Sequence, residues 1–394
     1  MVQLSTIRFQ KGSYLLIEGK SDNDRFFIIQ QGSVKIFHEI EVDDSLSSIL
    51  GPGDFVGVVP CMSGHNQTES VVALTDVVAI SVPKEQYTNL IATNTSVALK
   101  IITFFAHQMR KYNAILAKLT TQHTVFESCE QLFQTGLYYE KNRQFNIAAF
   151  AYYQYLVACK GSLYYEEVKH RFIKIRPLTA NVMYETNSEL QRNYPKNTMI
   201  FCESQAGHEM YIIQEGQVKI SKVVDGNEVV LAILQKGDLF GEMALLENKP
   251  RSASAIANED CKLMVVNRQN FDNMVATQPQ LIYRLTTTLA DRLWSMQRQL
   301  VNTLIKDPTA KMLDMLVIQL EKQKIKIMPK MSYQFNYTPE DIAKMCGIPL
   351  EETQCIHNFV NDRRVKLVQN KIFVADCYEV LKTSELFRKQ ILKS

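Results

Sequence analysis

The stretch FGEMALLENKPRSASA, residues 240–255, places a glycine and a glutamate ten residues ahead of an arginine and a serine. Glycine lets a backbone come close to a ligand, and the planar guanidinium of arginine offers several donors to an anion. A glutamate beside them accepts hydrogen bonds from hydroxyl groups. Gly241, Glu242, Arg251 and Ser252 therefore predict a pocket for a small molecule that carries both a phosphate and hydroxyls.

The segment that contains this stretch occurs twice in the chain. FFIIQQGSVKI in the first copy matches MYIIQEGQVKI in the second, and each is followed by a Gly-Asp turn, LGPGDFVG or LQKGDLFG. Alternating β-branched and aromatic residues with glycine between them are typical of short strands joined by tight turns. The repeated segment is too long for one solenoid unit, so we predict a duplicated β domain.

The second copy resembles a cyclic-nucleotide-binding domain of the Crp/Fnr (catabolite-activator) type. The pattern F-G-E-hydrophobic-A-L, a short spacer and P-R-S-A is present as Phe240, Gly241, Glu242, Met243, Ala244, Leu245, Pro250, Arg251, Ser252 and Ala253. The resemblance implies an α+β fold with two jelly-roll (β-roll) domains, a helical linker and a C-terminal winged helix-turn-helix.

The resemblance also implies roles for the residues of the pattern. Arg251 and the amides of the helical turn after Gly241 would bind the cyclic phosphate, and Ser252 would add a donor. Glu242 would accept from the ribose 2′-hydroxyl, with Phe240, Met243 and Ala244 completing the ligand site. The alternative is an Arg-Glu ion pair on a surface turn.

The first copy lacks the two charged groups. When the Gly-Asp turns are aligned, Val58 stands in place of Glu242, and Gln67 and Thr68 stand in place of Arg251 and Ser252. Loss of one partner of a buried charged contact costs about 2–5 kcal/mol of binding free energy. We expect the first copy to bind no cyclic mononucleotide and to be structural; the alternative is a pocket for another ligand.

Residues 126–176 show a different pattern. Leu132, Gly136, Tyr139, Ala148 and Tyr152 have the spacing of a tetratricopeptide repeat, in which small residues let two antiparallel helices approach closely. A single helical hairpin cannot bury its own apolar face, so it must pack on a neighbouring domain or on a protein partner.

Residues 279–306 predict a long helix with one apolar seam at spacings of three and four. The seam comprises Ile282, Leu285, Leu289, Leu293, Met296, Leu300 and Leu304. In the family that the chain resembles, this helix pairs two subunits and contacts the base, so we expect a homodimer and a base contact near Met296 and Gln297. Those two residues are not the Thr-Ser pair of adenine-binding activators. Cyclic AMP is the expected effector, with cyclic GMP and a cyclic dinucleotide as alternatives.

Residues 307–394 resemble the family's winged helix-turn-helix, with Thr338 opening the first helix and a wing over residues 365–374. The base-reading arginines of the family's pattern are absent, and the segment has 14 basic and 11 acidic residues, a net charge of +3. DNA is the expected partner, and protein contact is the alternative. The candidate DNA-binding residues are Thr338, Lys344, Glu351, Thr353, Gln354, Arg363, Arg364, Lys366 and Lys371.

Composition limits the remaining functions. The net charge of the chain is +3, and no apolar run reaches the roughly 18 residues needed to span a bilayer. The N-terminus lacks a signal-peptide pattern, and the eight scattered cysteines predict reduced thiols and no metal site. No pattern of catalytic residues is evident, so we expect a cytoplasmic protein that is not an enzyme and has no membrane contact.

These observations predict five segments: a degenerate cyclic-nucleotide-binding-like domain with a trailing helix (1–125), a helical tetratricopeptide-like linker (126–176), a cyclic-nucleotide-binding domain (177–278), a dimerisation helix (279–306) and a winged helix-turn-helix (307–394). Together they predict a transcription factor in which ligand binding at the second roll changes how the winged helix is presented. The alternative is a nucleotide-sensing scaffold that acts through protein contacts alone.

Overall fold

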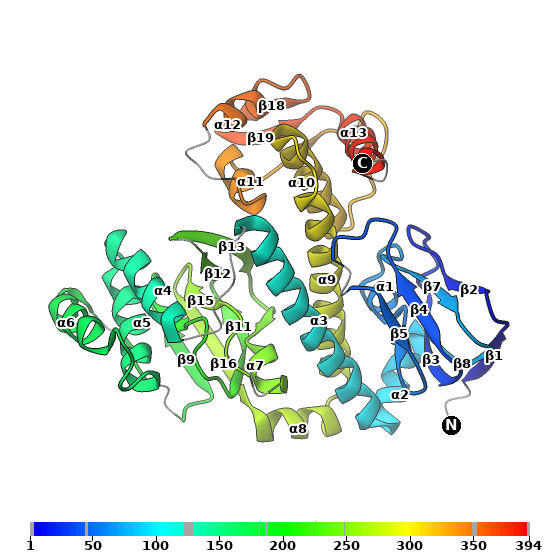
Figure 1. Cartoon of the computed structure of the whole chain (residues 1–394), viewed down its shortest axis with the longest axis horizontal. Coiled ribbons are helices and arrows are strands. Elements are labelled where there is room, and N and C mark those ends of the chain that lie inside the picture. Colours follow the sequence, from blue (N-terminus) through cyan, green and yellow to red (C-terminus); the bar gives the residue numbers. More distant parts are fainter. Residues whose placement is uncertain are drawn as a thin grey trace. The chain divides into compact units, whose positions relative to one another are not determined.

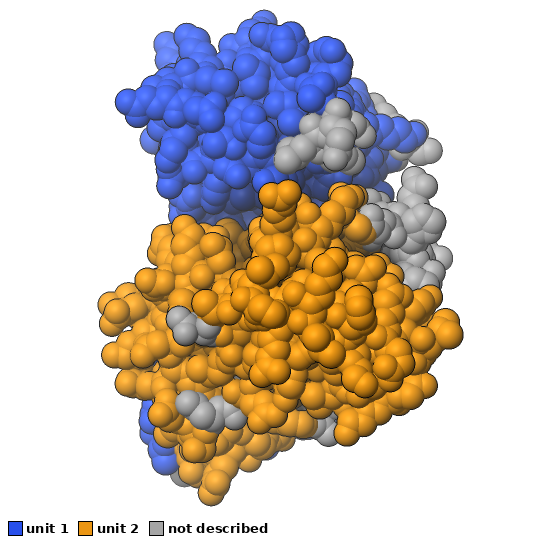
Figure 2. All heavy atoms as spheres, turned by 90° about the vertical axis from the view of Figure 1, so that its left-hand side faces the viewer, with its two compact units in different colours: residues 1–116, 275–394 blue, residues 117–274 orange. Residues whose placement is uncertain are grey.

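The computed structural model describes residues 4–43, 46–121, 129–180, 182–185, 188–224, 226–247, 249–348 and 353–391 (Figure 1). The chain divides into two compact units, which Figure 2 shows in different colours. Unit 1 consists of residues 1–116 and 275–394, and unit 2 consists of residues 117–274. The first β-roll, the long helix and the C-terminal segment thus belong to unit 1, while the helical linker and the second β-roll belong to unit 2.

The first β-roll consists of two four-stranded antiparallel sheets with the orders β1-β8-β3-β6 and β2-β7-β4-β5. Its strands are β1 Ser5–Phe9, β2 Tyr14–Leu16, β3 Arg25–Gln31, β4 Val34–Phe37, β5 Ser48–Leu50, β6 Phe55–Val56, β7 Ser70–Ala73 and β8 Val77–Pro83. Alternate apolar side chains such as Phe27, Ile29 and Val34 point into one shared core. The helices of the roll are α1 Val58–Ser63, η2 Lys84–Gln86, α2 Tyr87–Thr93 and the long α3 Thr95–Thr121.

The second β-roll repeats this topology, which confirms the predicted duplication. Its sheets have the orders β14-β11-β16-β9 and β10-β15-β12-β13. Even the irregularities recur, because a register shift between Ile29 and Gln31 in β3 has its counterpart between Ile213 and Glu215 in β11. The elements are β9 Gln191–Tyr194, β10 Met199–Phe201, β11 Glu209–Glu215, β12 Val218–Val224, β13 Asn227–Leu234, β14 Leu239–Phe240, α7 Glu242–Glu247, β15 Ser254–Ala257, β16 Cys261–Asn267 and α8 Arg268–Thr277.

The helical linker packs on the second roll. It contains α4 Cys129–Lys141, α5 Phe145–Ala158, α6 Tyr165–Ile175 and η3 Arg176–Leu178. Gln131 on α4 donates a hydrogen bond to the Val223 carbonyl at 2.5 Å, and the Tyr139 hydroxyl donates to Glu228 at 2.7 Å. Side chains of the linker and the roll form one hydrophobic core. The neighbour that the hairpin requires is therefore the second roll, whereas the tetratricopeptide-like identity of the linker stays a prediction.

The cysteines of this linker differ from the sequence prediction of reduced thiols. Cys129 and Cys159 form a disulfide with their Cα atoms 5.9 Å apart. The two residues open α4 and follow α5, and an antiparallel hairpin brings such positions together although they lie 30 residues apart. The six other cysteines form no disulfide, in agreement with the predicted reduced thiols, and all but Cys355 are buried.

Gly136 fixes the distance between α4 and α5. A Cβ atom at this position would lie 2.2 Å from the Tyr152 ring, whose side chain is fully buried and whose hydroxyl donates to Glu140 at 2.5 Å. Because that ring cannot move aside, we expect Gly136→Ala to lower the stability of unit 2 by about 1–3 kcal/mol despite the better helix propensity of alanine. Hydrogen–deuterium exchange of α4 and α5 peptides measures the loss. Gly51→Ala, where a Cβ meets nothing within 4 Å, is the matched control; equal protection in the two variants would contradict the prediction.

The long helix α9 Pro279–Thr303 packs against α1, α2 and α10 within unit 1. The Tyr87 hydroxyl lies 3.0 Å from the Thr286 hydroxyl, and Gln297 donates to the Tyr112 hydroxyl of α3 at 2.7 Å. Five of the seven seam residues are buried in the single chain: Ile282, Leu285, Leu289, Leu293 and Leu300. The homodimer stays a prediction, but most of the seam from which it was predicted is already covered by the chain itself.

The C-terminal segment contains α10 Pro308–Lys322, β17 Tyr333–Gln334, α11 Pro339–Met345, α12 Thr353–Val360, β18 Val365–Val368, β19 Lys371–Val374 and α13 Cys377–Ile391. The helix that Thr338 opens and the hairpin over residues 365–374 lie where the sequence predicted them. Strand β17, which completes a three-stranded sheet of order β17-β19-β18, and helix α13 were not predicted. Thr338 caps α11 by accepting from the Asp341 amide at 3.2 Å, in a capping box.

Among the described helices, none is by itself both long and apolar enough to cross a membrane. One pair, residues 84–93 and 95–116, meets the length and composition test jointly but is bent by 117°.

Candidate functional site

Gly241 brings the backbone of the second roll close to an arginine. It lies between β14 and α7 with φ of 78°, a left-handed conformation that favours glycine. A Cβ atom here would lie 2.8 Å from Arg251 Nη1 and 3.2 Å from the Phe201 ring. Local backbone geometry therefore requires the glycine that the sequence pattern singles out.

Arg251 is 5% exposed, and three groups hold its guanidinium. Nη1 donates to the Gly241 carbonyl at 2.7 Å, and the guanidinium carbon lies 4.1 Å from the centroid of the Phe201 ring and 5.9 Å from that of Tyr211. Among the described residues the Nε atom has no hydrogen-bond partner. Burial lowers the pKa of Arg251, and the nearby Tyr211, Glu209 and Glu242 oppose that shift. The result is a buried cation with an unused donor at Nε, a group suited to bind an anion.

The environment of Arg251 includes residues that sequence analysis missed. Arg192 makes two parallel hydrogen bonds to Glu209, at 2.7 and 2.8 Å, and the Tyr211 hydroxyl donates to the same carboxylate at 3.1 Å. Gly207 is the second glycine whose backbone lies close to Arg251, because a Cβ there would lie 2.2 Å from Arg251 Nε. These residues belong to strands and turns outside the F-G-E…P-R-S pattern, and only the alignment of whole rolls could have signalled them.

The remaining residues of the pattern lie in the same unit. Phe240, Glu242, Met243 and Ala244 are each 6% exposed or less. The Ser252 hydroxyl, half-buried, donates to the Met243 sulfur at 3.3 Å. The burial of Arg251 and Glu242 contradicts the alternative in which they form an ion pair on a surface turn.

Met296 and Gln297 belong to α9 in unit 1, whereas the pattern around Arg251 belongs to unit 2. Gln297 donates to Tyr112, as described above, and lines a cavity of unit 1. The structure thus assigns seven of the nine predicted ligand residues to one unit and two to the other.

The first roll keeps the backbone of the site and changes its chemistry. Gly57 has φ of 73° and precedes α1, as Gly241 precedes α7. Val58 and Gln67 are both 2% exposed, and Gln67 Nε2 donates to the Asp22 carbonyl at 2.8 Å. His65 stacks on Trp294 with ring centroids 3.8 Å apart. A neutral amide thus occupies the position of the arginine, as the sequence predicts.

Two carboxyl groups of the first roll make the stability of unit 1 depend on pH. Burial raises the pKa of Glu18 and of Glu69 from 4.5 to about 7, and Glu18 adds a repulsive contribution at Glu69. Between pH 4.5 and about pH 7 the folded state binds more protons than the unfolded state, so the free energy of unfolding falls as the pH rises. This loss of stability is absent below pH 4.5 and complete above about pH 7.

We expect the double variant Glu18→Gln/Glu69→Gln to lose this decline and to be more stable than the native chain above pH 7. Urea unfolding at a series of pH values, followed by the fluorescence of Trp294, the only tryptophan, reports on unit 1. An unchanged pH slope in the double variant would show that other groups cause the dependence.

The candidate DNA-binding residues differ in exposure and in the partners that hold them. Lys344, Thr353, Gln354 and Lys366 are exposed. Arg364 is held by Asp362 through two hydrogen bonds, at 2.7 and 2.6 Å, and by Thr383, while Arg363 pairs with Glu379 and Lys371 with Asn336. Thr338 serves as the cap of α11. Glu351 lies outside the described residues.

Comparison with known proteins identifies the two rolls. The family model for the cyclic nucleotide-binding domain matches residues 6–94 and 191–278, which cover the strands of both rolls except Ser5, the first residue of β1. The chain carries two cyclic nucleotide-binding domains. The copy with Arg251 and the copy with Gln67 thus share one domain type and differ at the position of the cation.

The relatives of the chain include proteins named as transcriptional regulators. The Cyclic AMP receptor protein of Thermus thermophilus is 36% identical over 104 residues, which are 26% of this chain and 48% of that protein. The CRP-like cAMP-activated global transcriptional regulator of Mycobacterium tuberculosis is 24% identical over 186 residues, 47% of this chain and 83% of that protein. Among solved structures, a CooA variant from Carboxydothermus hydrogenoformans is 19% identical with a TM-score of 0.42, covering 49% of this chain and 87% of its own.

Proposed function

We propose that the chain is a cyclic-nucleotide-responsive, DNA-binding transcriptional regulator whose effector binds in the second roll. The observation that carries the proposal is the buried Arg251, with an unused Nε donor, beside Gly241 and Glu242 in a cyclic nucleotide-binding domain. The relatives named above as cyclic AMP receptor and cAMP-activated regulator support cyclic AMP as the first effector to test. Cyclic GMP and a cyclic dinucleotide are the alternatives.

In this proposal the cyclic phosphate takes the unused donor of Arg251. The guanidinium is already removed from water and stacked on Phe201, so binding the anion does not require its desolvation. Ser252 donates a further hydrogen bond to the phosphate, and Glu242 accepts from the ribose hydroxyl. Phe240, Met243 and Ala244 line the same site.

The C-terminal segment acts in this proposal as a winged helix. Helix α12 presents the exposed Thr353 and Gln354 to base edges, and the exposed Lys344 and Lys366 contact phosphates. Arg364 and Lys371 hold neighbouring residues in the same segment, so we expect them to shape this surface more than to contact DNA. Arg363 pairs with Glu379 at the surface and is 83% exposed, so we expect it to contact a phosphate as Lys344 and Lys366 do.

The second candidate function is a nucleotide-sensing scaffold, and one observation favours it. Four apolar side chains of the helical linker are exposed, between 53% and 87%: Val157, Leu163, Ile173 and Leu178. Such residues on a hairpin that already packs on a roll offer a surface to a protein partner.

Calorimetric titration of the full chain with cyclic AMP, cyclic GMP and a cyclic dinucleotide tests the effector. We expect one of them to bind at one per chain. Selection from a random duplex library with and without that ligand then tests the DNA partner, and enrichment of a defined sequence is expected. Ligand binding without any enriched sequence would favour the scaffold, and binding of none of the three ligands would overturn the proposed function.

A further inference from the structure

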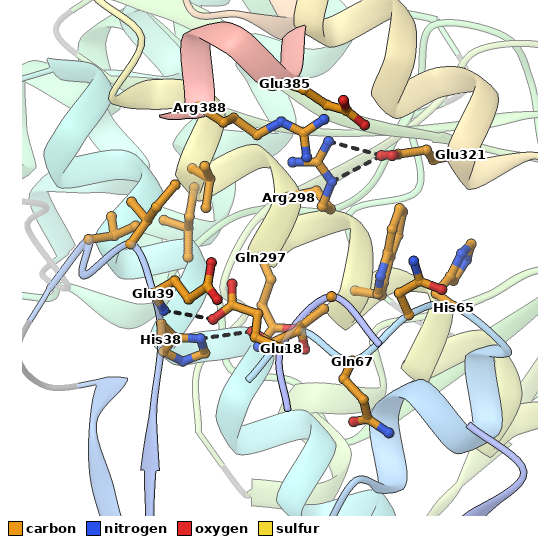
Figure 3. Close-up of a pocket in the computed structure, with 18 of the residues that line it drawn as sticks. Glu18, His38, Glu39, His65, Gln67, Gln297, Arg298, Glu321, Glu385 and Arg388 are labelled. Carbon is orange, nitrogen blue, oxygen red and sulfur yellow. Dashed lines mark hydrogen bonds and ion pairs between the residues drawn. The ribbon is translucent and has the colours of Figure 1, made fainter. Parts of the chain in front are cut away.

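Unit 1 contains a cavity of about 1030 Å³ at the side of the first roll, here called the unit 1 cavity (Figure 3). Its walls come from the first roll, from α9, from the end of α10 with the residues that follow, and from α13. The volume is at the upper end of the range for small-molecule sites. It is thus large enough for a nucleotide.

The lining of the unit 1 cavity includes five cations from α9, from α13 and from the residues after α10: Arg298, Lys324, Lys326, Arg388 and Lys389. Glu321 and Glu385 line the same cavity and lie near Arg298 and Arg388 (Figure 3). Figure 3 shows Arg388 and Arg298 at the same end of the cavity, with Arg298 hydrogen-bonded to Glu321 at 2.9 and 3.0 Å. Lys324 pairs with Asp291 at 3.3 Å.

Arg388 has a buried donor that no hydrogen bond to the described residues satisfies, although Asp314, Glu321 and Glu385 lie near its guanidinium. Its Nη2 donates to the Ser384 hydroxyl at 3.0 Å, but its buried Nε has no hydrogen-bond partner among the described residues. The nearest carboxylate oxygen, Asp314 Oδ1, is 3.6 Å away and already accepts from Ser384. An anion in the cavity would take this donor.

The opposite end of the unit 1 cavity offers acceptors. Glu18 and Glu39 lie there, with Glu18 accepting from the Glu39 amide at 2.7 Å (Figure 3). The buried Oε1 atoms of Gln67 and Gln297 have no hydrogen-bond partners among the described residues. Each unpaired buried acceptor costs free energy that a ligand donating hydrogen bonds would recover.

We propose that the unit 1 cavity binds a second effector, a non-cyclic 5′-nucleotide, with its phosphate at Arg388 and Lys389 and its hydroxyl and amino groups at Glu18, Gln67 and Gln297. The arginine that binds a phosphate in the second roll has no counterpart in the first roll, where Gln67 replaces it. Cations of α13 supply the charge instead, from the opposite end of the cavity. Binding of the phosphate therefore ties the first roll to the C-terminal segment, and the site is independent of the proposed cyclic-nucleotide site.

Trp294 makes this proposal directly measurable. It lines the cavity, is 5% exposed and is the only tryptophan of the chain, so its emission reports on this one place. The full chain is titrated with 5′-AMP, 5′-GMP and pyrophosphate, and with adenosine, which lacks the phosphate. We expect a saturating change of Trp294 emission with a 5′-nucleotide, a weaker response to pyrophosphate, and none with adenosine.

Variants separate the two ends of the cavity from each other and from the second roll. Arg388→Gln and Lys389→Gln are each expected to lower the affinity for the 5′-nucleotide by about tenfold or more. Glu18→Gln is expected to lower the affinity for the nucleotide but not the affinity for pyrophosphate. Lys382→Gln removes the same charge from an exposed position of α13 that does not line the cavity and should change nothing. Because Arg388 also contacts buried groups, the exposed Lys389 keeps the test valid if Arg388→Gln folds poorly.

Two outcomes would overturn the proposal. The first is an emission that no 5′-nucleotide changes. The second is a response that survives Arg388→Gln and Lys389→Gln but disappears in Arg251→Gln, because that would assign the nucleotide to the second roll.

Discussion

The Arg251→Gln variant will bind the cyclic nucleotide about 30-fold to several-thousand-fold more weakly than the native chain. This range corresponds to about 2–5 kcal/mol, the usual cost of removing one partner of a desolvated, charged contact. Glutamine keeps much of the side-chain length and removes the cation, so the pocket is altered in charge more than in shape. Calorimetric titration gives the dissociation constant directly.

The fold of the second roll should tolerate this change. Arg251 has no ion pair within 4 Å among the described residues, and burial lowers its pKa despite the nearby Glu209 and Glu242, so the charged side chain is costly to the folded state. We therefore expect the variant to unfold at the same temperature as the native chain or above it. A drop in affinity accompanied by loss of structure would contradict this account.

Gln67→Ala is the matched control, because Gln67 occupies the aligned position of the first roll. We expect it to leave cyclic nucleotide binding unchanged at one ligand per chain. Two equivalent sites in the native chain, one of them lost in Gln67→Ala, would show that an amide can replace the arginine in this domain.

The parts of the site that follow from local geometry could be predicted from the sequence. Gly241 and Arg251 belong to one short sequence pattern. The same backbone turn recurs at Gly57 in the first roll, so alignment of the two copies predicted where the turn lies in each. The pattern also predicted which copy lacks the cation.

Contacts between distant segments could not be predicted. Nothing in the sequence links Arg192 to Glu209 or Cys129 to Cys159, because single residues of common types carry no signal of their partner. The seam of α9 was correctly predicted to be apolar, yet periodicity gives the buried face and not what covers it. The packing of Trp294 of α9 on His65 of the first roll is one such contact that periodicity could not predict.

The Asp314→Leu variant is expected to lose about 3–5 kcal/mol of the unfolding free energy of unit 1. Asp314 on α10 is fully buried and accepts hydrogen bonds from Asn302, at 2.9 Å, and from Ser384. Its Oδ1 also lies 3.9 Å from Arg298 and 3.6 Å from Arg388. Leucine has a similar volume but leaves two arginines and two polar groups without their shared acceptor. Urea unfolding followed by the fluorescence of Trp294 measures the loss.

Asp307→Ala on the same helix provides the comparison. Asp307 caps α10 by accepting from the Thr309 amide at 3.0 Å, and loss of such a cap costs only about 1 kcal/mol. A larger loss of unfolding free energy in Asp314→Leu than in Asp307→Ala therefore measures the contribution of the buried network, separately from that of the α10 cap. The network joins α9, α10 and α13 through one carboxylate, so a large loss in Asp314→Leu would identify the contact that holds the C-terminal segment to the long helix. If both variants lose about 1 kcal/mol, apolar packing alone holds these helices together, and ligand-induced changes at α9 would have to reach α13 through that packing.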